Sequence, residues 1–462
     1  MRLTLEQIRY WMSAEFAAPH FVDKAAASGY SIDSRTIGRG EIFFAVKGER
    51  FDGHDFVEAA LSSGALAAVV SSARSAQFTL PAVRARLLLV DDPLAALQRL
   101  ASSVRRHWGK RVIGITGSAG KTTTKEAVAQ VLQSRYRVHK SQGNLNNHYG
   151  LPLQLLKLQP DQDVAILEMG MSRAGEIAAL CHIAAPDWGV VTNVGMAHGE
   201  NFADGQAGIA RAKYELIAAL PRHGTAILNC DDSYVQQFGR DFEGTVVYFG
   251  TGSCADPRAE RIVPLGTQGT RFTVVAGEER AELQLKLMGE HNVRNALAGI
   301  AAGLASGISL PECAAALQSL EPPDRRGQTL RLRGATLIDD CYNCNPQALQ
   351  AMVKTLLTIP AQRRIVVAGE MLELGPESPR LHYESGKSMA TLGVDLVLGV
   401  RGEAASLVAG AKAAGTEALF LESPEDAGAW LRNHLRTGDA VLLKASRGVR
   451  LERALEVLQR AE

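Results

Sequence analysis

The strongest chemical signal in the sequence is a glycine-rich loop before a lysine and three threonines, GITGSAGKTTTKEA, at 114–127. An apolar run precedes it and a helical pattern follows it, which is the setting of a phosphate-binding loop. Lys121 would supply a positive charge at the helix start, and Thr122 or Thr123 a hydroxyl for Mg²⁺. The amides that can surround phosphate oxygens belong to Gly117, Ser118, Ala119 and Gly120. Although Ile115 stands where GxxxxGK[ST] has its first glycine, the setting favours a nucleotide site over a plain helix-capping turn.

Two side chains at predicted strand ends can complete a metal site beside this loop. Glu168 closes the apolar run VAILE, and His198 follows the run WGVVTNVG by a few residues. Groups at the carboxyl ends of parallel strands face the crevice in which ligands bind. A carboxylate and an imidazole there would hold Mg²⁺ next to the phosphates. Each residue alone is better explained as an ordinary strand-end residue, but their shared position favours a functional role.

The residues alone leave the roles of two other segments undecided. Lys213 lies in the helical stretch GIARAKYELI, where a solvated helix lysine is the simpler interpretation. The stretch GNLNNHYGLP at 143–152 is rich in amide side chains. Asn146 and Asn147 can form a polar loop over a substrate, or belong to a plain turn.

The last third of the chain carries polar clusters where three predicted strands end. IDDCYNCNP at 338–346 places Asp339 and Asp340 at a strand end, and GEMLELG and KASRG end two other strands. Such clusters on one sheet predict a binding face. Cys341 and Cys344 form a lone CxxC, but no thioredoxin-like tryptophan precedes it, so a redox role is the weaker interpretation.

Strand–helix alternation with apolar strands predicts an α/β protein with parallel sheets covered on both faces. We expect a small N-terminal α/β domain at 1–104, a central P-loop ATPase-like domain at 105–322 and a C-terminal Rossmann-like domain at 323–462. The central domain should contain a β-rich insert made of GTVVYFG, TRFTVV and ELQLKL, followed by a buried Ala/Gly-rich helix near 292–306. Pro322 and Pro323 mark a hinge before the third domain.

The composition excludes several classes of protein. The chain has 462 residues, a formal net charge of +1 and 46% hydrophobic residues, so it is neither disordered nor a basic nucleic-acid binder. No apolar stretch reaches the length of a membrane span, and the N-terminus MRLTLEQIRYW has no secretory h-region. We therefore expect a cytoplasmic protein whose six cysteines are free thiols.

Taken in order, the motifs resemble those of the Mur ligase family, the ATP-dependent amide ligases of peptidoglycan precursor synthesis. The resemblance runs along essentially the whole chain. The matching motifs are DSRTIGRGEIFFAVKGERFDGHDF, TGSAGKTTTK, GNLNNHYGLP, EMGMSRAGEI, TNVGMAHGENF, ARAKYE, LNCDD, GEHNVRNALAG, IDDCYNCNP, GEMLELG and LLKASRG. A few positions differ from the family motifs; for example, Arg325 stands where a glycine is usual.

The resemblance implies a role for individual residues. The implied catalytic residues are Lys121, Glu168, His198 and Lys213. The implied magnesium ligands are Thr122, Glu168, His198 and Lys213, the last carrying a carbamate formed with CO₂. The implied nucleotide contacts outside the phosphate loop are Asn229, Asn292, Asn295, Arg326 and Asp340. The implied substrate contacts are Ser34, Arg35 and Thr36 for the uridine diphosphate end, with Asn146 and Asn147.

The implied reaction uses ATP to activate the terminal carboxylate of a UDP-linked tripeptide as an acyl phosphate, which the amine of D-alanyl-D-alanine then attacks. A monomer that supports cell-wall biogenesis, and through it cell shape and division, is expected. The nearest rivals are the ligase that adds the third residue and a folylpolyglutamate synthase. The third-residue ligase that takes a diamino acid carries DNPR, whereas this chain has CNPQ. A nucleotide-driven switch would carry NKxD for guanine, which is not found here.

Overall fold

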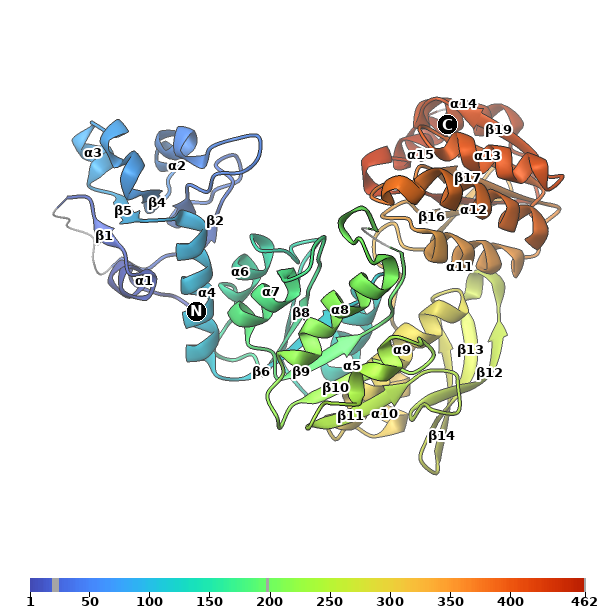
Figure 1. Cartoon of the computed structure of the whole chain (residues 1–462), viewed down its shortest axis with the longest axis horizontal. Helices are drawn as coiled ribbons and strands as arrows, with labels where there is room; N and C mark the ends of the chain where they lie inside the picture. Colours follow the sequence, from blue (N-terminus) through green and yellow to red (C-terminus); the bar gives the residue numbers. More distant parts are fainter. Residues whose placement is uncertain (19–24, 197–198, 461–462) are drawn as a thin grey trace.

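The structure is a computed structural model, and it describes residues 1–18, 25–196 and 199–460. Figure 1 shows three α/β units along the chain, with the N-terminal unit at the left, the central unit in the middle and the C-terminal unit at the right. The three-domain α/β architecture predicted from the sequence is therefore confirmed. The exact boundaries at 104/105 and 322/323 remain predictions, and the first of them falls within a continuous helix, Pro93–Trp108.

The N-terminal unit is built on a five-stranded sheet with strand order β1-β5-β4-β3-β2, in which only β1 runs antiparallel. Its strands β3, β4 and β5 consist of the apolar runs EIFF, AAVVS and LLLV. The strands are β1 (Glu15–Phe16), β2 (Gly29–Ser31), β3 (Glu41–Phe44), β4 (Ala67–Ser71) and β5 (Leu87–Val90). The helices are α1 (Leu5–Met12), α2 (Val57–Ser62), α3 (Pro81–Arg84) and α4 (Pro93–Trp108).

The central unit has a six-stranded parallel sheet with strand order β11-β10-β9-β6-β8-β7. Its strands are β6 (Arg111–Thr116), β7 (Val138–Lys140), β8 (Val164–Glu168), β9 (Trp188–Val191), β10 (Thr225–Asn229) and β11 (Thr245–Phe249). Its helices are α5 (Lys121–Leu132), α6 (Gly150–Leu155), α7 (Glu176–Ala184), α8 (Gly205–Ala218), α9 (Glu290–Ala305) and α10 (Leu310–Leu317).

The predicted β-rich insert is present but smaller than expected. It is a three-stranded antiparallel sheet of β12 (Arg258–Pro264), β13 (Thr270–Ala276) and β14 (Glu279–Leu285). The assignment of GTVVYFG to the insert was wrong, because this segment is β11 and pairs in parallel with β10. As the edge strand of the sheet, β11 is only partly buried, unlike the fully buried strands β10 and β9.

The phosphate-binding loop leaves β6 near the middle of the central sheet, where neighbouring strands flank it on both sides. Helices α5 and α9 pack against one face of this sheet in a single hydrophobic cluster. The predicted Ala/Gly-rich helix is α9, and its small residues allow close approach: a Cβ on Gly299 would lie 2.9 Å from the backbone of Ala127. The close packing of α9 against α5 therefore fixes the start of α5 above the strand ends.

The C-terminal unit has a six-stranded sheet, β15-β16-β20-β17-β18-β19, parallel except for β15. The three strands predicted to end in polar clusters are confirmed as β16 (Ala335–Asp340), β17 (Arg363–Gly369) and β20 (Asp439–Lys444). The sheet also contains β18 (Leu396–Val400), β19 (Glu417–Leu421) and the edge strand β15 (Gln328–Leu332), which was missed. The helices are α11 (Pro346–Leu357), α12 (Ser378–Leu392), α13 (Ala404–Ala413), α14 (Pro424–His434) and α15 (Glu452–Gln459).

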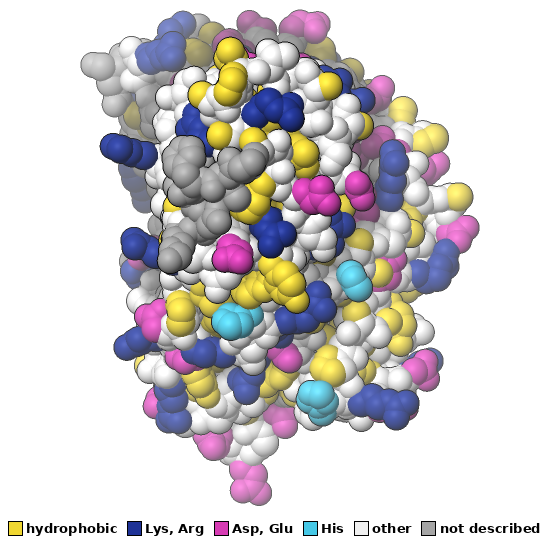
Figure 2. Space-filling view, turned by 90° about the vertical axis from the view of Figure 1, so that its left-hand side faces the viewer, with side chains coloured by type: hydrophobic (Ala, Val, Ile, Leu, Met, Phe, Trp, Pro, Cys, Tyr) yellow, Lys and Arg dark blue, Asp and Glu magenta, His cyan; other side chains and the backbone are white. Residues whose placement is uncertain are grey.

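The surface agrees with the near-neutral composition. On the face shown in Figure 2, basic and acidic side chains are interspersed. Among the described residues, no helix is both long and apolar enough to cross a bilayer.

Candidate functional site

A cavity of about 770 Å³ lies where strand ends of the central and C-terminal sheets face each other. The phosphate loop after β6, Glu168 at the end of β8 and Asn229 at the end of β10 line it from the central unit. Asp340 at the end of β16 and Lys444 at the end of β20 line it from the C-terminal unit. The two predicted sites therefore form one cavity.

The glycines of the phosphate loop are required by its geometry. Gly120 has φ of 83° and directly precedes α5, so Lys121 is the first helical residue. A Cβ on Gly117 would lie 1.8 Å from Oγ1 of Thr192, so only glycine fits there. The N–H groups of Ser118 and Ala119 donate to the backbone oxygen and Oδ1 of Asn193, at 3.0 and 2.9 Å. The unpaired amides of the first turn of α5 remain to bind an anion.

Glu168 is buried and its two carboxylate oxygens are held from two sides. Thr122 Oγ1 donates to Oε2 at 2.8 Å, and Asn146 Nδ2 donates to Oε1 at 2.9 Å. The backbone N–H of Glu168 donates to Ser141 Oγ at 3.1 Å. The structure therefore brings together the phosphate loop, the strand-end acid and the amide-rich loop, three features that the sequence predicted separately. Asn146 lies over the site, whereas the side chain of Asn147 caps the start of α6 and still lines the cavity.

Two lysines lie close enough to repel each other, Lys121 in the cavity wall and Lys213 in α8. Lys121 is half-buried rather than fully exposed on a loop, and its Nζ donates to the carbonyl of Gly117 at 2.7 Å. Burial lowers the pKa of Lys121; Glu168 raises it and Arg326 lowers it further. Lys213 in α8 is 2% exposed, so the solvated-lysine interpretation was wrong. Burial, and then repulsion by Lys121, lowers the pKa of Lys213 well below its ordinary value.

A sequence signal for the burial of Lys213 was present. Ile209 and Leu216 lie four residues before and three residues after it, so the three side chains share one face of α8. Both apolar neighbours are fully buried. A lysine at that register of a helix is expected to be buried with them.

The side chains of the nucleotide contacts predicted in the central unit are each held by hydrogen bonds. Asn229 Nδ2 donates to the carbonyl of Thr192 at 2.7 Å. Asn295 Nδ2 donates to Oδ1 of Asn292 at 3.0 Å, and Oδ1 of Asn295 accepts from Thr124 Oγ1 at 3.1 Å. Asn229, Asn292 and Asn295 all line the cavity, so the fold brings this predicted set together.

The C-terminal wall holds the remaining predicted contacts. Asp340 forms an ion pair with Lys444, whose Nζ also donates to the carbonyl of Asn343 at 2.9 Å. The guanidinium of Arg326 lies over the ring of Tyr342, 4.0 Å from its centroid. Arg325 takes a left-handed φ of 55°, a conformation that glycine adopts more readily and that explains the usual glycine of the resemblance.

Five predicted residues lie apart from this geometry. Lys213 in α8 does not line the cavity. His198 lies outside the described residues, and within the described part of the chain no three His, Cys, Asp or Glu side chains cluster as metal ligands. Ser34, Arg35 and Thr36 lie in a turn after β2 and do not line the cavity. Arg35 there is paired with Asp33, with Nη2 and Oδ2 2.6 Å apart.

Comparison with known proteins identifies the family. The middle-domain model of the Mur ligases matches residues 115–303, the Mur ligase catalytic-domain model matches 27–105, and the glutamate ligase domain model matches 325–447. A Bacillus subtilis (strain 168) relative, a UDP-N-acetylmuramoyl-tripeptide--D-alanyl-D-alanine ligase, is 35% identical over 99% of this chain and 98% of its own.

The chain belongs to the Mur ligase family.

Solved structures agree with this assignment. MurF from Acinetobacter baumannii superposes on this Mur ligase with a TM-score of 0.89 and 28% identity, covering 100% of this chain and 99% of its own. MurF ligase from Thermotoga maritima, solved in complex with ADP, gives a TM-score of 0.82 at 31% identity, covering 94% and 97%. The ADP complex of that relative supports a nucleotide site in this Mur ligase.

Several charged residues that line the cavity were not predicted as site residues, among them Asp231, Arg294 and Lys444. Asp231 and Arg294 are paired at 2.7 Å. Asp231 and Arg294 lie within the matched motifs LNCDD and GEHNVRNALAG, two residues after Asn229 and one residue before Asn295. Lys444 ends β20, and the rule that strand-end residues line the crevice would have selected it.

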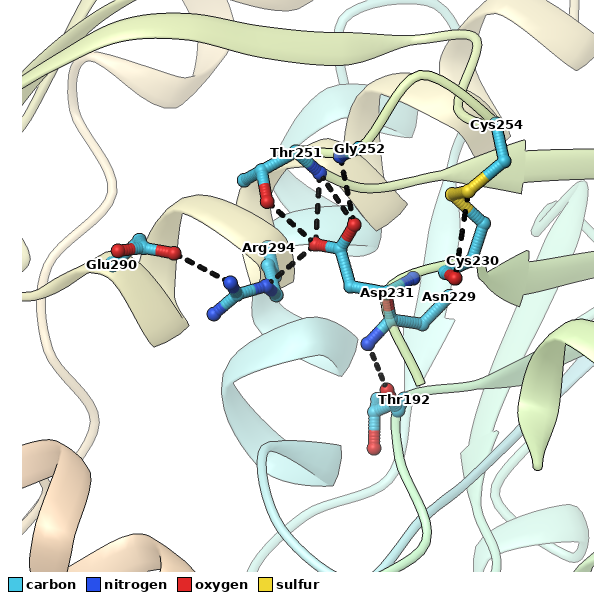
Figure 3. Close-up of polar contacts among 9 residues, drawn as sticks. All are labelled: Thr192, Asn229, Cys230, Asp231, Thr251, Gly252, Cys254, Glu290 and Arg294. Carbon is cyan, nitrogen blue, oxygen red and sulfur yellow. Dashed lines mark hydrogen bonds and ion pairs between the residues drawn. A yellow bond between two sulfur atoms is a disulfide. The ribbon is translucent and has the colours of Figure 1, made fainter. Parts of the chain in front are cut away.

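The expectation that all cysteines are free was wrong for one pair. Cys230 and Cys254 form a disulfide beside the cavity (Figure 3). Cys230 follows β10 and Cys254 follows β11, and these strands are neighbours in the sheet. A separation of 24 residues gives no sign of this contact until the strand order is known. The four other cysteines, including the CxxC pair, are buried free thiols.

Proposed function

We propose that this Mur ligase uses ATP to join D-alanyl-D-alanine to a UDP-N-acetylmuramoyl-tripeptide in peptidoglycan precursor synthesis. The observation that carries the proposal is the identity of 35% along 99% of the chain with a relative of that activity. The cavity supports it, since a phosphate loop and a buried acid face a second sheet across a space large enough for a nucleotide.

The reaction has two steps. The γ-phosphoryl group of ATP moves to the terminal carboxylate of the tripeptide and leaves ADP and an acyl phosphate. The free amine of the dipeptide then attacks the acyl carbon, loses a proton and expels phosphate as the amide bond forms. Lys121 and the first amides of α5 would hold the β- and γ-phosphates and offset the charge that develops during transfer. Closure of the C-terminal wall would keep water from the acyl phosphate.

Thr122 and Glu168 fit a magnesium ion by the chemistry of their oxygens. Their side-chain oxygens lie 2.8 Å apart. Neighbouring ligands in an octahedron with Mg–O distances of about 2.0–2.1 Å are about 2.9 Å apart. We propose both residues as ligands, together with His198 and a modified Lys213. When bound, the ion would neutralise charge on the phosphates.

Lys213 fits the proposed carbamate. Carbamate formation requires the neutral amine, which attacks CO₂ and releases a proton. The lowered pKa of Lys213, caused by burial and by Lys121, raises the share of neutral amine. The product is an anion, so the modification replaces a lysine that Lys121 would repel with an oxygen ligand that Lys121 attracts.

The remaining substrate contacts and the setting are further proposals. The uridine diphosphate end would bind the turn of Ser34, Arg35 and Thr36 in the N-terminal unit, while Asn146 and Asn147 face the peptide end. The enzyme would work as a monomer in the cytoplasm, where ATP is available.

The decisive test is phosphate release measured with each candidate pair of UDP-linked peptide and amine acceptor. We expect release with a tripeptide and D-alanyl-D-alanine together, and background release when either is omitted. The same assay with lysine or diaminopimelate as the third residue identifies the accepted tripeptide. Rapid hydrolysis of ATP alone would instead identify a nucleotide switch.

A further inference from the structure

Asp231 joins three separate segments of the cavity wall, as Figure 3 shows. It follows β10 directly and its side chain is only 15% exposed. Its carboxylate accepts the backbone N–H groups of Thr251 and Gly252, each at 2.8 Å, and the Thr251 hydroxyl at 2.9 Å. Nε of Arg294, on α9, donates to the same carboxylate at 2.7 Å. One carboxylate thus connects the end of β10, the segment after β11 and helix α9.

The contacts of Asp231 favour its charged form. Burial opposes ionisation, but the bonds from Arg294, Thr251 and Gly252 outweigh it and lower the pKa of Asp231. Arg294 is paired on its other side with Glu290, one turn earlier in α9. Charge-assisted hydrogen bonds of this kind are about twice as strong as neutral ones, so the three segments are held firmly.

The backbone of Asp231 also sets the orientation of Asn229. The N–H of Asp231 donates to Oδ1 of Asn229 at 3.0 Å, while Nδ2 of Asn229 donates to the carbonyl of Thr192. The amide of Asn229 is therefore fixed at both ends. Any shift of the Asp231 backbone moves the acceptor side of this amide, which lines the cavity.

A second connection joins two of the same segments. The Cys230–Cys254 disulfide links the residue before Asp231 to the residue two positions after Gly252. The disulfide and the Asp231 carboxylate therefore cross the same gap between the β10 and β11 ends, one covalently and one by hydrogen bonds (Figure 3).

We propose that Asp231 is a positioning residue for the nucleotide, which holds Asn229 and the 250–252 segment in their binding geometry, with the Cys230–Cys254 disulfide as a second tie in the same wall. The inference rests on the nucleotide site proposed above. It assigns to Asp231 an effect on ATP affinity that acts through Asn229, and to the Cys230–Cys254 disulfide a supporting role in the same wall.

The test is the dissociation constant for ADP, measured by calorimetry without reductant. Asp231→Asn keeps the size of the side chain but removes one acceptor oxygen and the charge that Arg294 requires. We expect ADP to bind about tenfold more weakly, and Asp231→Ala to weaken it further. Because each tie partly compensates for the other, Asp231→Asn combined with Cys230→Ser and Cys254→Ser should weaken binding by more than the product of the separate effects.

Kinetics separate positioning from a general structural effect. In Asp231→Asn the KM for ATP should rise with the ADP dissociation constant, while kcat and the KM for the UDP-linked tripeptide stay within about twofold of wild type. Asp163→Asn is the matched control, because Asp163 also accepts a backbone N–H and pairs with a lysine, but lies at the opposite end of the sheet.

Wild-type affinity in Asp231→Asn, or a loss confined to kcat, would overturn the proposed role of Asp231. If the losses of ADP affinity in Asp231→Asn and in the double cysteine variant only multiply when combined, the disulfide does not act as a second connection. Failure of the wild-type protein to bind ADP in the same titration would instead contradict the proposed function itself.

Discussion

Thr122 donates its hydroxyl hydrogen to Oε2 of Glu168 across 2.8 Å, and this bond joins the first turn of α5 to the end of β8. The phosphate loop lies directly before α5, so a metal ion held by these two oxygens would lie beside the bound phosphates. The bond thus places the proposed metal site relative to the nucleotide before either is bound.

Thr122→Val replaces the hydroxyl by a methyl group of equal size. We expect kcat/KM for ATP to fall about 100-fold and the Mg²⁺ concentration for half-maximal rate to rise, because one oxygen ligand is lost. Steady-state rates over a magnesium titration measure both effects. Thr391→Val on the exposed side of α12 is the control and should behave like wild type. An unchanged magnesium dependence in Thr122→Val would remove Thr122 from the ligand set.

Lys121→Ala should reduce turnover about 1,000-fold while the protein stays folded, because the charge facing the β- and γ-phosphates is lost and the side chain is not part of the hydrophobic core. Turnover and circular dichroism provide the two measurements. Lys387→Ala, which removes an exposed lysine from α12, is the matched control. Near-normal turnover in folded Lys121→Ala would disprove the phosphate-loop assignment.

Lys213→Ala should be nearly inactive, and an added small carboxylate such as acetate should restore part of the rate by occupying the place of the carbamate. Lys213→Glu, an anion on a shorter stem, should also retain part of the rate. Carbon-13 NMR after equilibration with labelled CO₂ should show a carbamate signal in wild type and none in Lys213→Ala. Lys157→Ala, at an exposed lysine, should keep both rate and signal. An active wild-type enzyme without the signal would contradict the carbamate.

His139 should make the protein sensitive to acid. It is 7% exposed and its Nε2 has no hydrogen-bond partner. Burial lowers its pKa from 6.5 to about 4. The unfolded chain therefore takes up a proton first as the pH falls from 6.5 towards 4, and stability is lost over that window. The free energy of unfolding should be about 2 kcal/mol lower at pH 5 than at pH 7.5 from this group alone.

Urea titrations at the two pH values measure this difference. In His139→Gln the loss between pH 7.5 and pH 5 should shrink by about the same 2 kcal/mol. His182→Gln, at an exposed position of α7, should leave the loss unchanged. An equal loss in wild type and His139→Gln would show that other groups cause the acid sensitivity.

The strands that carry the site could be predicted because they are buried on both faces. Continuous apolar runs such as VAILE and ATLI fixed the strand ends at Glu168 and Asp340, and parallel strand order then implied a shared crevice. Edge strands such as β15 were missed because no residue of this strand is fully buried and the run includes exposed polar residues. The signal of a buried strand weakens wherever the sheet meets solvent.

Contacts between distant segments were the part that sequence reasoning could not provide. The Asp231–Arg294 pair and the Cys230–Cys254 disulfide depend on β11 lying beside β10 and on α9 packing over the same edge. Neither placement follows from local spacing. By contrast, the burial of Lys213 could be predicted from the sequence, because Lys213 lies on the apolar face of α8.

Helix α4 sets a fixed spacing between the N-terminal and the central unit. It is one unbroken helix of 16 residues, about 24 Å long. The side chain of Arg99 donates to the carbonyl of Met12 in the N-terminal unit, and that of Trp108 donates to the carbonyl of Gln159 in the central unit. With the uridine end bound at Ser34–Thr36 as proposed above, this fixed spacing would select a peptide of one length. A peptide one residue shorter would then place its carboxylate about 3.3–3.6 Å further from the phosphate loop.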